Sequence, residues 1–152
     1  MGVAVRGSLS VPGSESCMPV TSRVLVQDPV DPYELSAAAA GAAGLPAPAG
    51  GWHLYELGAV STLQADEEPD ALVALSVHFP PNGGRLPPAE DEQRPEGYVL
   101  ACFETPESDP AADRLHHQRL AATLGLWMRQ RTLRWCWQYD DEPWDTGPPA
   151  GP

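Results

Sequence analysis

The sequence contains no lysine: all nine of its basic residues are arginines, set against 21 aspartates and glutamates, and the formal net charge is −12. An electrostatic field of that sign repels phosphate backbones and anionic lipid headgroups. Direct binding to nucleic acid or to a membrane is therefore disfavoured, and a protein with a basic surface is the more natural partner. The lysine-free composition, rich in Ala, Gly, Pro and Arg, is typical of coding in a GC-rich genome.

Long apolar runs and paired cysteines are also missing. Nowhere do the roughly eighteen consecutive apolar residues of a membrane-spanning helix occur, and the first residues lack the apolar run of a secretory signal peptide. The only cysteines are Cys17, Cys102 and Cys136. An odd number without CxxC spacing argues against a disulfide framework and favours reduced, mostly buried thiols. These features together predict a cytoplasmic protein.

The length of 152 residues suits one domain with one core, although 18 prolines and 14 glycines assign much of the chain to loops. We expect a single α+β domain at residues 18–146. Residues 1–17, rich in Gly and Ser, are predicted to be a flexible leader or a mis-assigned start, with Met18 as the true first residue. Residues 147–152, almost entirely Gly and Pro, are predicted to be a disordered tail.

Two segments carry helix signals. Asp31, Pro32 and Glu34 form an N-cap, a proline at the first helical position and a partial capping box, which predict an alanine-rich helix over 33–43. Asp109 and a following proline repeat the signal before a helix over about 111–132. The second helix carries one apolar stripe, formed by His117, Leu120, Ala121, Leu124, Trp127 and Met128.

Five segments carry strand signals, at 23–27, 52–59, 71–79, 97–104 and 133–139. Period-two alternation places Val73, Leu75, Val77 and Phe79 on one buried face. The same spacing places Leu133, Trp135, Trp137 and Tyr139 on one face of the last strand, as an aromatic ladder that fills the core. The order βαβββαβ predicts two helices packed on one face of a mainly antiparallel, about five-stranded sheet, a ferredoxin-like variant. Such a topology implies no particular chemistry.

Four histidines are the main candidates for catalysis or metal binding. His53 and His78 are expected on neighbouring strands, and His117 could face them from the second helix, so a three-histidine metal site is one hypothesis. No HExxH, HxH or Cys-His spacing accompanies them. The alternative, which we favour, is that each is a surface histidine or a hydrogen-bonded one at the edge of the core.

Nucleophilic and phosphate chemistry find little support in the sequence. Cys102 and Cys136 lie within apolar strands rather than beside cations at a helix start, so the pKa of each thiol should be ordinary or raised. No serine lies in a G-x-S-x-G elbow, and the glycines after Asn82 lack the lysine of a phosphate-binding loop. We therefore assign no catalytic residue and no cofactor.

Two acidic segments are candidates for a binding surface. The first follows the last strand, where Asp140, Asp141, Glu142 and Asp145 surround Trp144, and the second is the run Glu90, Asp91 and Glu92. Carboxylates of this kind steer a basic partner, and a tryptophan can anchor it. A divalent-ion site, an acid/base pair for sugar chemistry and a simple solvated turn are the alternatives.

Four segments resemble uncharacterised small acidic proteins of high-GC actinobacteria and their mobile elements. They are Met18-Pro-Val-Thr-Ser-Arg-Val-Leu-Val, Trp52-His-Leu-Tyr-Glu, Ser76-Val-His-Phe-Pro80 and Arg134-Trp-Cys-Trp-Gln-Tyr-Asp-Asp-Glu-Pro-Trp144. The resemblance supports the start at Met18 and the cytoplasmic setting, and implies no activity.

Three functional hypotheses follow from the sequence. The leading one is a non-enzymatic interaction or accessory domain, inhibitor-like, that presents acidic groups and Trp144 to a basic partner. The second is a small enzyme or metal-binding domain that uses the histidines. The third is a nucleic-acid mimic, in which carboxylates imitate the spacing of phosphates.

Overall fold

The computed structural model describes residues 19–45, 52–65, 73–87, 94–106 and 109–145. The predicted leader, the predicted tail and the acidic run Glu90–Glu92 lie outside these described residues. In chain order the elements are β2 (Val20–Val26), α1 (Pro32–Ala42), β3 (Trp52–Leu57), β4 (Val60–Ala65), β5 (Ala74–Phe79), β6 (Val99–Thr105), α2 (Pro110–Gln130) and β7 (Trp135–Tyr139).

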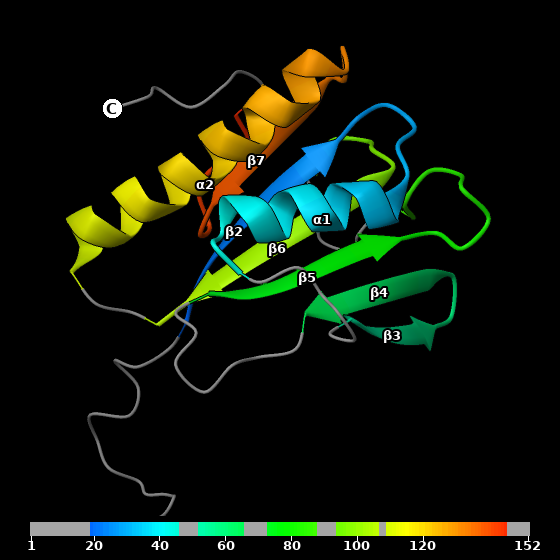
Figure 1. Ribbon diagram of the computed structural model, residues 1–152, viewed down its shortest axis with the longest axis horizontal. Coiled ribbons are helices and arrows are strands. Elements are labelled where there is room, and N and C mark those ends of the chain that lie inside the picture. The colour runs from blue at the N-terminus through cyan, green and yellow to red at the C-terminus, as the bar shows by residue number, and fades with distance from the viewer. Residues whose placement is uncertain (1–18, 46–51, 66–72, 88–93, 107–108, 146–152) are drawn as a thin grey trace, which may run out of the picture.

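The strands form one six-stranded sheet in the order β3-β4-β5-β6-β2-β7, with every neighbouring pair antiparallel. Both helices lie on the same face of this sheet (Figure 1). The predicted α+β architecture, with two helices on one face of an antiparallel sheet, is therefore confirmed.

The predicted number and order of strands were wrong in detail. The strand expected at 52–59 ends at Leu57, turns at Gly58 and Ala59, and returns as β4, which the sequence analysis missed. Ser61, Thr62 and Gln64 weaken the apolar alternation of β4, although Ser61 and Leu63 are both buried. The element order is consequently βαββββαβ, and the β3–β4 hairpin extends the sheet beyond the five-stranded ferredoxin-like variant.

The main core lies between the sheet and the helices. The sheet contributes the side chains of its helix-covered face, among them Val24, Val77 and Phe103, all buried. Small side chains let α1 approach the sheet, since Ala39 and Ala40 are both in the core. The predicted buried faces of β5, α2 and β7 all belong to this core, and Trp135, Trp137 and Tyr139 fill space under the helix layer as expected.

A smaller core covers part of the opposite face of the sheet. Leu25 and Cys136 are fully buried there under Leu86 from the β5–β6 connection. Trp144 packs at the rim of the same cluster. The segment after β7 therefore folds back over this face of the sheet.

Neither described helix is long and apolar enough to cross a membrane.

Candidate functional site

The sheet divides the three histidines that were candidates for a metal site. His117 is on α2 and is fully buried between that helix and the sheet. His78 alternates with Val77 and Phe79, which face the helices, so it lies on the opposite face. His53 shares that opposite face, but β4 separates its strand from β5. The arrangement does not bring these three side chains together.

His78 and His117 are instead each hydrogen-bonded to two hydroxyl groups. His117 Nδ1 lies 2.5 Å from Ser22 Oγ, and its Nε2 lies 2.8 Å from Thr105 Oγ1. His78 Nδ1 lies 2.8 Å from Thr62 Oγ1, and its Nε2 lies 3.2 Å from Ser76 Oγ. Burial lowers the pKa of both rings, that of His117 to about 4. Both histidines thus belong to satisfied polar clusters that hold strands and helix together.

The two cysteine thiols in the described part of the chain are poorly suited to nucleophilic chemistry. Burial raises the pKa of both Cys102 and Cys136 to about 11, against a smaller opposing effect of nearby arginines. A thiol with so high a pKa holds little thiolate at neutral pH. Among the described residues, no group of three or more His, Cys, Asp and Glu side chains is placed to hold a metal ion.

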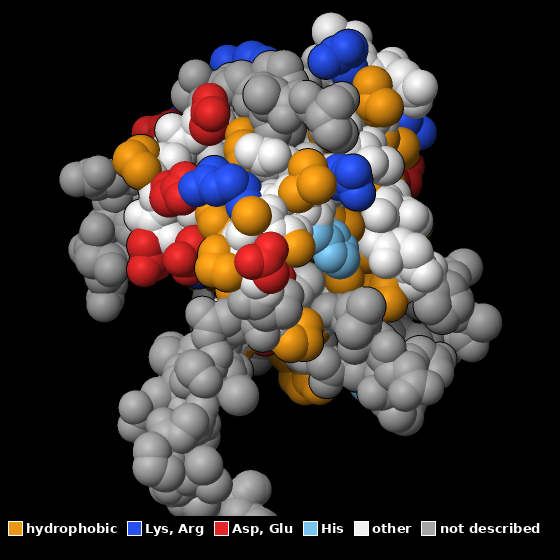
Figure 2. Space-filling model, turned by 90° about the vertical axis from the view of Figure 1, so that its left-hand side faces the viewer, with side chains coloured by type: hydrophobic (Ala, Val, Ile, Leu, Met, Phe, Trp, Pro, Cys, Tyr) orange, Lys and Arg blue, Asp and Glu red, His pale blue; other side chains and the backbone are white. Residues whose placement is uncertain are grey.

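The acidic turn, which we define as Asp140, Asp141 and Glu142, directly follows β7. All three residues are exposed, and Asp140 adopts a left-handed backbone with φ of 52°. Aspartate tolerates that conformation better than most residues do. Figure 2 views the molecule from this end and shows acidic side chains gathered beside a few arginines.

The backbone of the acidic turn is held at several points. Asp140 N donates to Thr21 O at 2.8 Å, and Glu142 N donates to Tyr139 O at 3.0 Å. The Gln138 side chain donates to Glu142 O at 2.9 Å. Arg23 reaches the same turn, donating to the Gln138 side chain at 3.0 Å and to Asp140 O at 3.4 Å. The turn is therefore braced by β2 as well as by its own strand.

Only one carboxylate of the acidic turn is neutralised by a described arginine. Arg114 forms an ion pair with Glu142 and also stacks over Tyr139, 4.7 Å from the ring centroid. Within the described part of the chain, neither Asp140 nor Asp141 has an ion pair. These two side chains are the charges that the turn presents to solvent.

The other predicted members of the acidic site are placed differently. Trp144 is half-buried, with its side chain against the small core of Leu25, Leu86 and Cys136. Asp145 is exposed but forms a backbone bridge with Trp137, through hydrogen bonds of 3.0 and 2.8 Å. Trp144 therefore fixes the segment to the sheet and exposes only part of its ring.

The sequence analysis missed one neighbour of the acidic turn. Glu104, at the end of β6, is exposed and lies directly opposite Thr21 in the sheet, and the carbonyl of Thr21 accepts the hydrogen bond from Asp140. The pairing of β2 with β6 and β7 thus brings a fourth carboxylate to this end. No local pattern could reveal it, because 36 positions separate Glu104 from Asp140 in the chain.

Three cavities are lined by described residues in and beside the β2–α1 and β5–β6 connections. One of about 340 Å³ is lined mainly by apolar and glycine residues, including Pro29, Phe79 and Tyr98, and its one carboxylate, Asp31, caps α1. A second, of about 350 Å³, lies between Arg85, Arg94 and Glu96, and a third, of about 230 Å³, contains Arg85 and Arg134. Arg85 pairs with Glu96 and Arg134 with Asp28, and Arg94 donates a hydrogen bond to the carbonyl of Pro87.

Comparison of the chain with protein-family models, with curated proteins and with solved structures finds no match. The resemblance to small actinobacterial proteins stays a prediction.

Proposed function

We propose that this chain is a protein-binding domain whose partner presents a basic surface, and that the acidic turn is a point of contact. The observation that carries the proposal is the braced backbone of the turn, which holds Asp140 and Asp141 exposed and without an ion pair to any described residue. Partner arginines or lysines are the groups that such carboxylates select.

The brace matters because flexible acidic segments lose conformational entropy when they bind. Ordering one rotamer-rich side chain at an interface costs about 0.5–1.5 kcal/mol, and a fixed backbone avoids the further cost of ordering a loop. Hydrogen bonds from Asp140, Glu142 and Gln138 fix the turn before any partner arrives. The net charge of −12 adds long-range steering, which accelerates association with a basic protein at low salt.

The proposal can be tested with a fluorescent nona-arginine peptide as a defined basic probe. We expect the double variant Asp140→Asn/Asp141→Asn to bind it about tenfold more weakly at low salt, since an exposed ion pair contributes up to about 1 kcal/mol. Fluorescence anisotropy titrations at two salt concentrations give both the affinity and its salt dependence.

The matched control is Asp31→Asn/Glu34→Gln, which removes the same charge from two exposed carboxylates at the start of α1 that pair with no described arginine. If both double variants lose the same affinity, the probe senses only net charge, and the acidic turn is not the contact. A selective loss in the Asp140/Asp141 variant supports the proposal.

A further inference from the structure

The two edge strands of the sheet, β7 and β3, differ in how far their outer sides are paired. The outer side of β7 is occupied in part by the chain itself, because Asp145 pairs with Trp137 through two backbone hydrogen bonds. At the opposite edge, β3 pairs with β4 on one side and has no described strand on the other. Figure 1 shows β3 beyond the helix layer, at the margin of the molecule.

The register of the hairpin fixes which backbone groups of β3 point outward. Leu57 and Val60 flank the two-residue turn of Gly58 and Ala59, and Gly58 has a φ of 63°, which suits the first position of a type II′ turn. The residues that flank such a turn form a hydrogen-bonded pair, and the pattern then alternates along the ladder. The N–H and C=O groups of Trp52, Leu54 and Glu56 are therefore directed away from β4.

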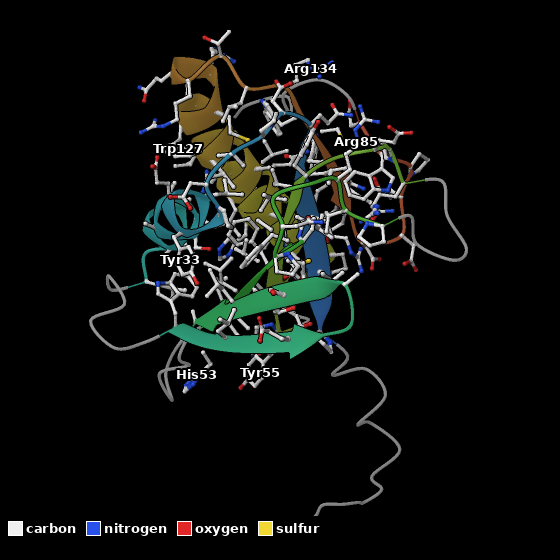
Figure 3. All side chains as sticks on the ribbon, turned by 90° about the vertical axis from the view of Figure 1, so that its right-hand side faces the viewer. Tyr33, His53, Tyr55, Arg85, Trp127 and Arg134 are labelled. Atoms are coloured by element: carbon white, nitrogen blue, oxygen red, sulfur yellow. The ribbon has the colours of Figure 1, made fainter. Side chains whose placement is uncertain are left out.

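Two large apolar side chains are exposed on this strand. Leu54 is 49% exposed on the face that carries the helices, and Tyr55 is 54% exposed on the other face. Figure 3 shows His53 and Tyr55 at the outer margin, pointing away from the rest of the sheet. Edge strands are commonly protected by proline, by charged side chains or by a bulge. β3 has no proline, pairs with β4 in unbroken register and carries a single charged residue, Glu56.

We propose that β3 is a docking edge, to which an extended segment of a basic partner adds as a seventh, antiparallel or parallel strand. In this mode backbone hydrogen bonds to Leu54 and its outward-facing neighbours supply affinity, and contacts to Leu54 and Tyr55 supply selectivity. The inference rests on the proposed function, since it names how the partner binds.

Charge favours a basic segment over a second copy of this chain. Glu56 is exposed on β3 and offers its carboxylate to a residue of the added strand. Opposite charges on directly facing positions stabilise strand pairs, whereas like charges destabilise them. Two copies would each bring a net charge of −12 to the contact.

A pair of substitutions at one position separates backbone pairing from side-chain contact. Leu54→Pro removes the outward N–H while leaving the bonds to β4, and proline is tolerated on edge strands where its nitrogen faces solvent. Leu54→Thr shortens the side chain and keeps the N–H. The probe is the peptide acetyl-Val-Arg-Val-Arg-Val-Arg-Val-amide, with a version N-methylated at alternate residues as its control.

We expect Leu54→Pro to weaken binding of the alternating peptide about tenfold in anisotropy titrations, Leu54→Thr to weaken it by less than about threefold, and N-methylation of the peptide to abolish it. Circular dichroism checks that the Pro variant is folded. The N-methylated peptide tests the same hydrogen bonds on the unaltered chain, so the proposal remains testable if the Pro variant does not fold.

Several outcomes overturn strand addition. Strand addition is ruled out if Leu54→Pro and Leu54→Thr lose the same affinity for the peptide, or if the N-methylated peptide binds as tightly as the unmodified one. A dimer in sedimentation equilibrium that Leu54→Pro abolishes would make a second copy the occupant, and overturns the basic segment. If only Asp140→Asn/Asp141→Asn weakens binding of the peptide, the proposed function stands and the docking edge is ruled out. If only Leu54→Pro weakens binding, the docking edge stands and the acidic turn is ruled out as a contact.

Discussion

Ser22 and His117 lie 95 positions apart in the chain, yet Ser22 Oγ is 2.5 Å from His117 Nδ1, and Thr105 Oγ1 is 2.8 Å from the other ring nitrogen. All three residues are buried. A hydroxyl can donate or accept, so the two hydroxyls satisfy both nitrogens of a neutral ring. Desolvation by burial is the main cause of the low pKa of His117, electrostatic repulsion by the neighbouring His116 adds to it, and Asp113 opposes both.

The first prediction is that His117 makes stability depend on pH. In the unfolded chain its pKa is near 6.5, whereas in the folded protein it is about 4. Between these values the unfolded state binds more protons, so the free energy of unfolding falls as the pH falls from about 6.5 to about 4. By pH 4 and below, this histidine lowers the free energy of unfolding by about 3 kcal/mol, whereas above pH 6.5 it does not affect stability. Urea unfolding at pH 7, 5.5 and 4.5 measures it.

His117→Gln should flatten that dependence, because glutamine cannot titrate. His53→Gln is the control, since it removes an exposed histidine from β3, at the far edge of the sheet. Carboxylates titrate in the unmutated chain and in both variants, so their contribution cancels when the slopes of the free energy of unfolding against pH are compared. A His117→Gln slope identical to that of the unmutated chain would show that this ring is not the source.

The second prediction concerns two helical glycines with opposite roles. A Cβ at Gly125 of α2 would lie 2.4 Å from the Trp135 ring, whereas a Cβ at Gly41 of α1 would meet no atom of the described residues within 4 Å. Gly125→Ala should therefore destabilise the protein by about 1–3 kcal/mol, because the helix must move off β7. Gly41→Ala should stabilise it by about 0.5–1 kcal/mol through reduced backbone entropy of the unfolded chain.

Urea unfolding of both variants measures whether each substitution raises or lowers the free energy of unfolding. Destabilisation by Gly41→Ala would contradict the open space around that position, and a neutral Gly125→Ala would contradict the close approach of α2 to Trp135.

Signals that depend on nearby residues predicted the helices well. Asp31 and Asp109 each precede a proline, and α1 and α2 begin at Pro32 and Pro110. An N-cap acts within its own first turn, so its effect is visible in a few letters of sequence. The missed strand β4 is different, because its polar residues become strand only through pairing with β3 and β5.

The histidine hypothesis failed for a reason that the sequence did contain. His78 alternates with Val77 and Phe79, and those two residues were predicted to face the core under the helices. Strand periodicity then places His78 on the other face, out of reach of a helix residue such as His117. The sequence shows that Asp140, Asp141 and Glu142 follow the last strand, but Glu104 comes close to them only through the long-range pairing of β2 with β6.

The third prediction is that Cys102 and Cys136 resist alkylation in the folded protein. With the pKa of each thiol raised to about 11, little thiolate is present at pH 8. In a Cys17→Ser background, iodoacetamide should modify both more than about tenfold more slowly than it does in urea-unfolded chain. Mass spectrometry at timed intervals follows the reaction, and rapid modification without denaturant would rule out the buried environment.

The fourth prediction tests the start of α2. Asp109 Oδ2 accepts a hydrogen bond from Ala112 N at 3.1 Å, and the carboxylate also lies at the positive end of the helix dipole. Asp109→Ala should cost about 1 kcal/mol of stability, because it leaves a helix N–H without its cap. Asp109→Asn keeps the cap and loses only the charge interaction, so its cost should be about 0.5 kcal/mol. Equal losses in the two variants, measured by urea unfolding, would mean that charge rather than the capping hydrogen bond stabilises the start of α2.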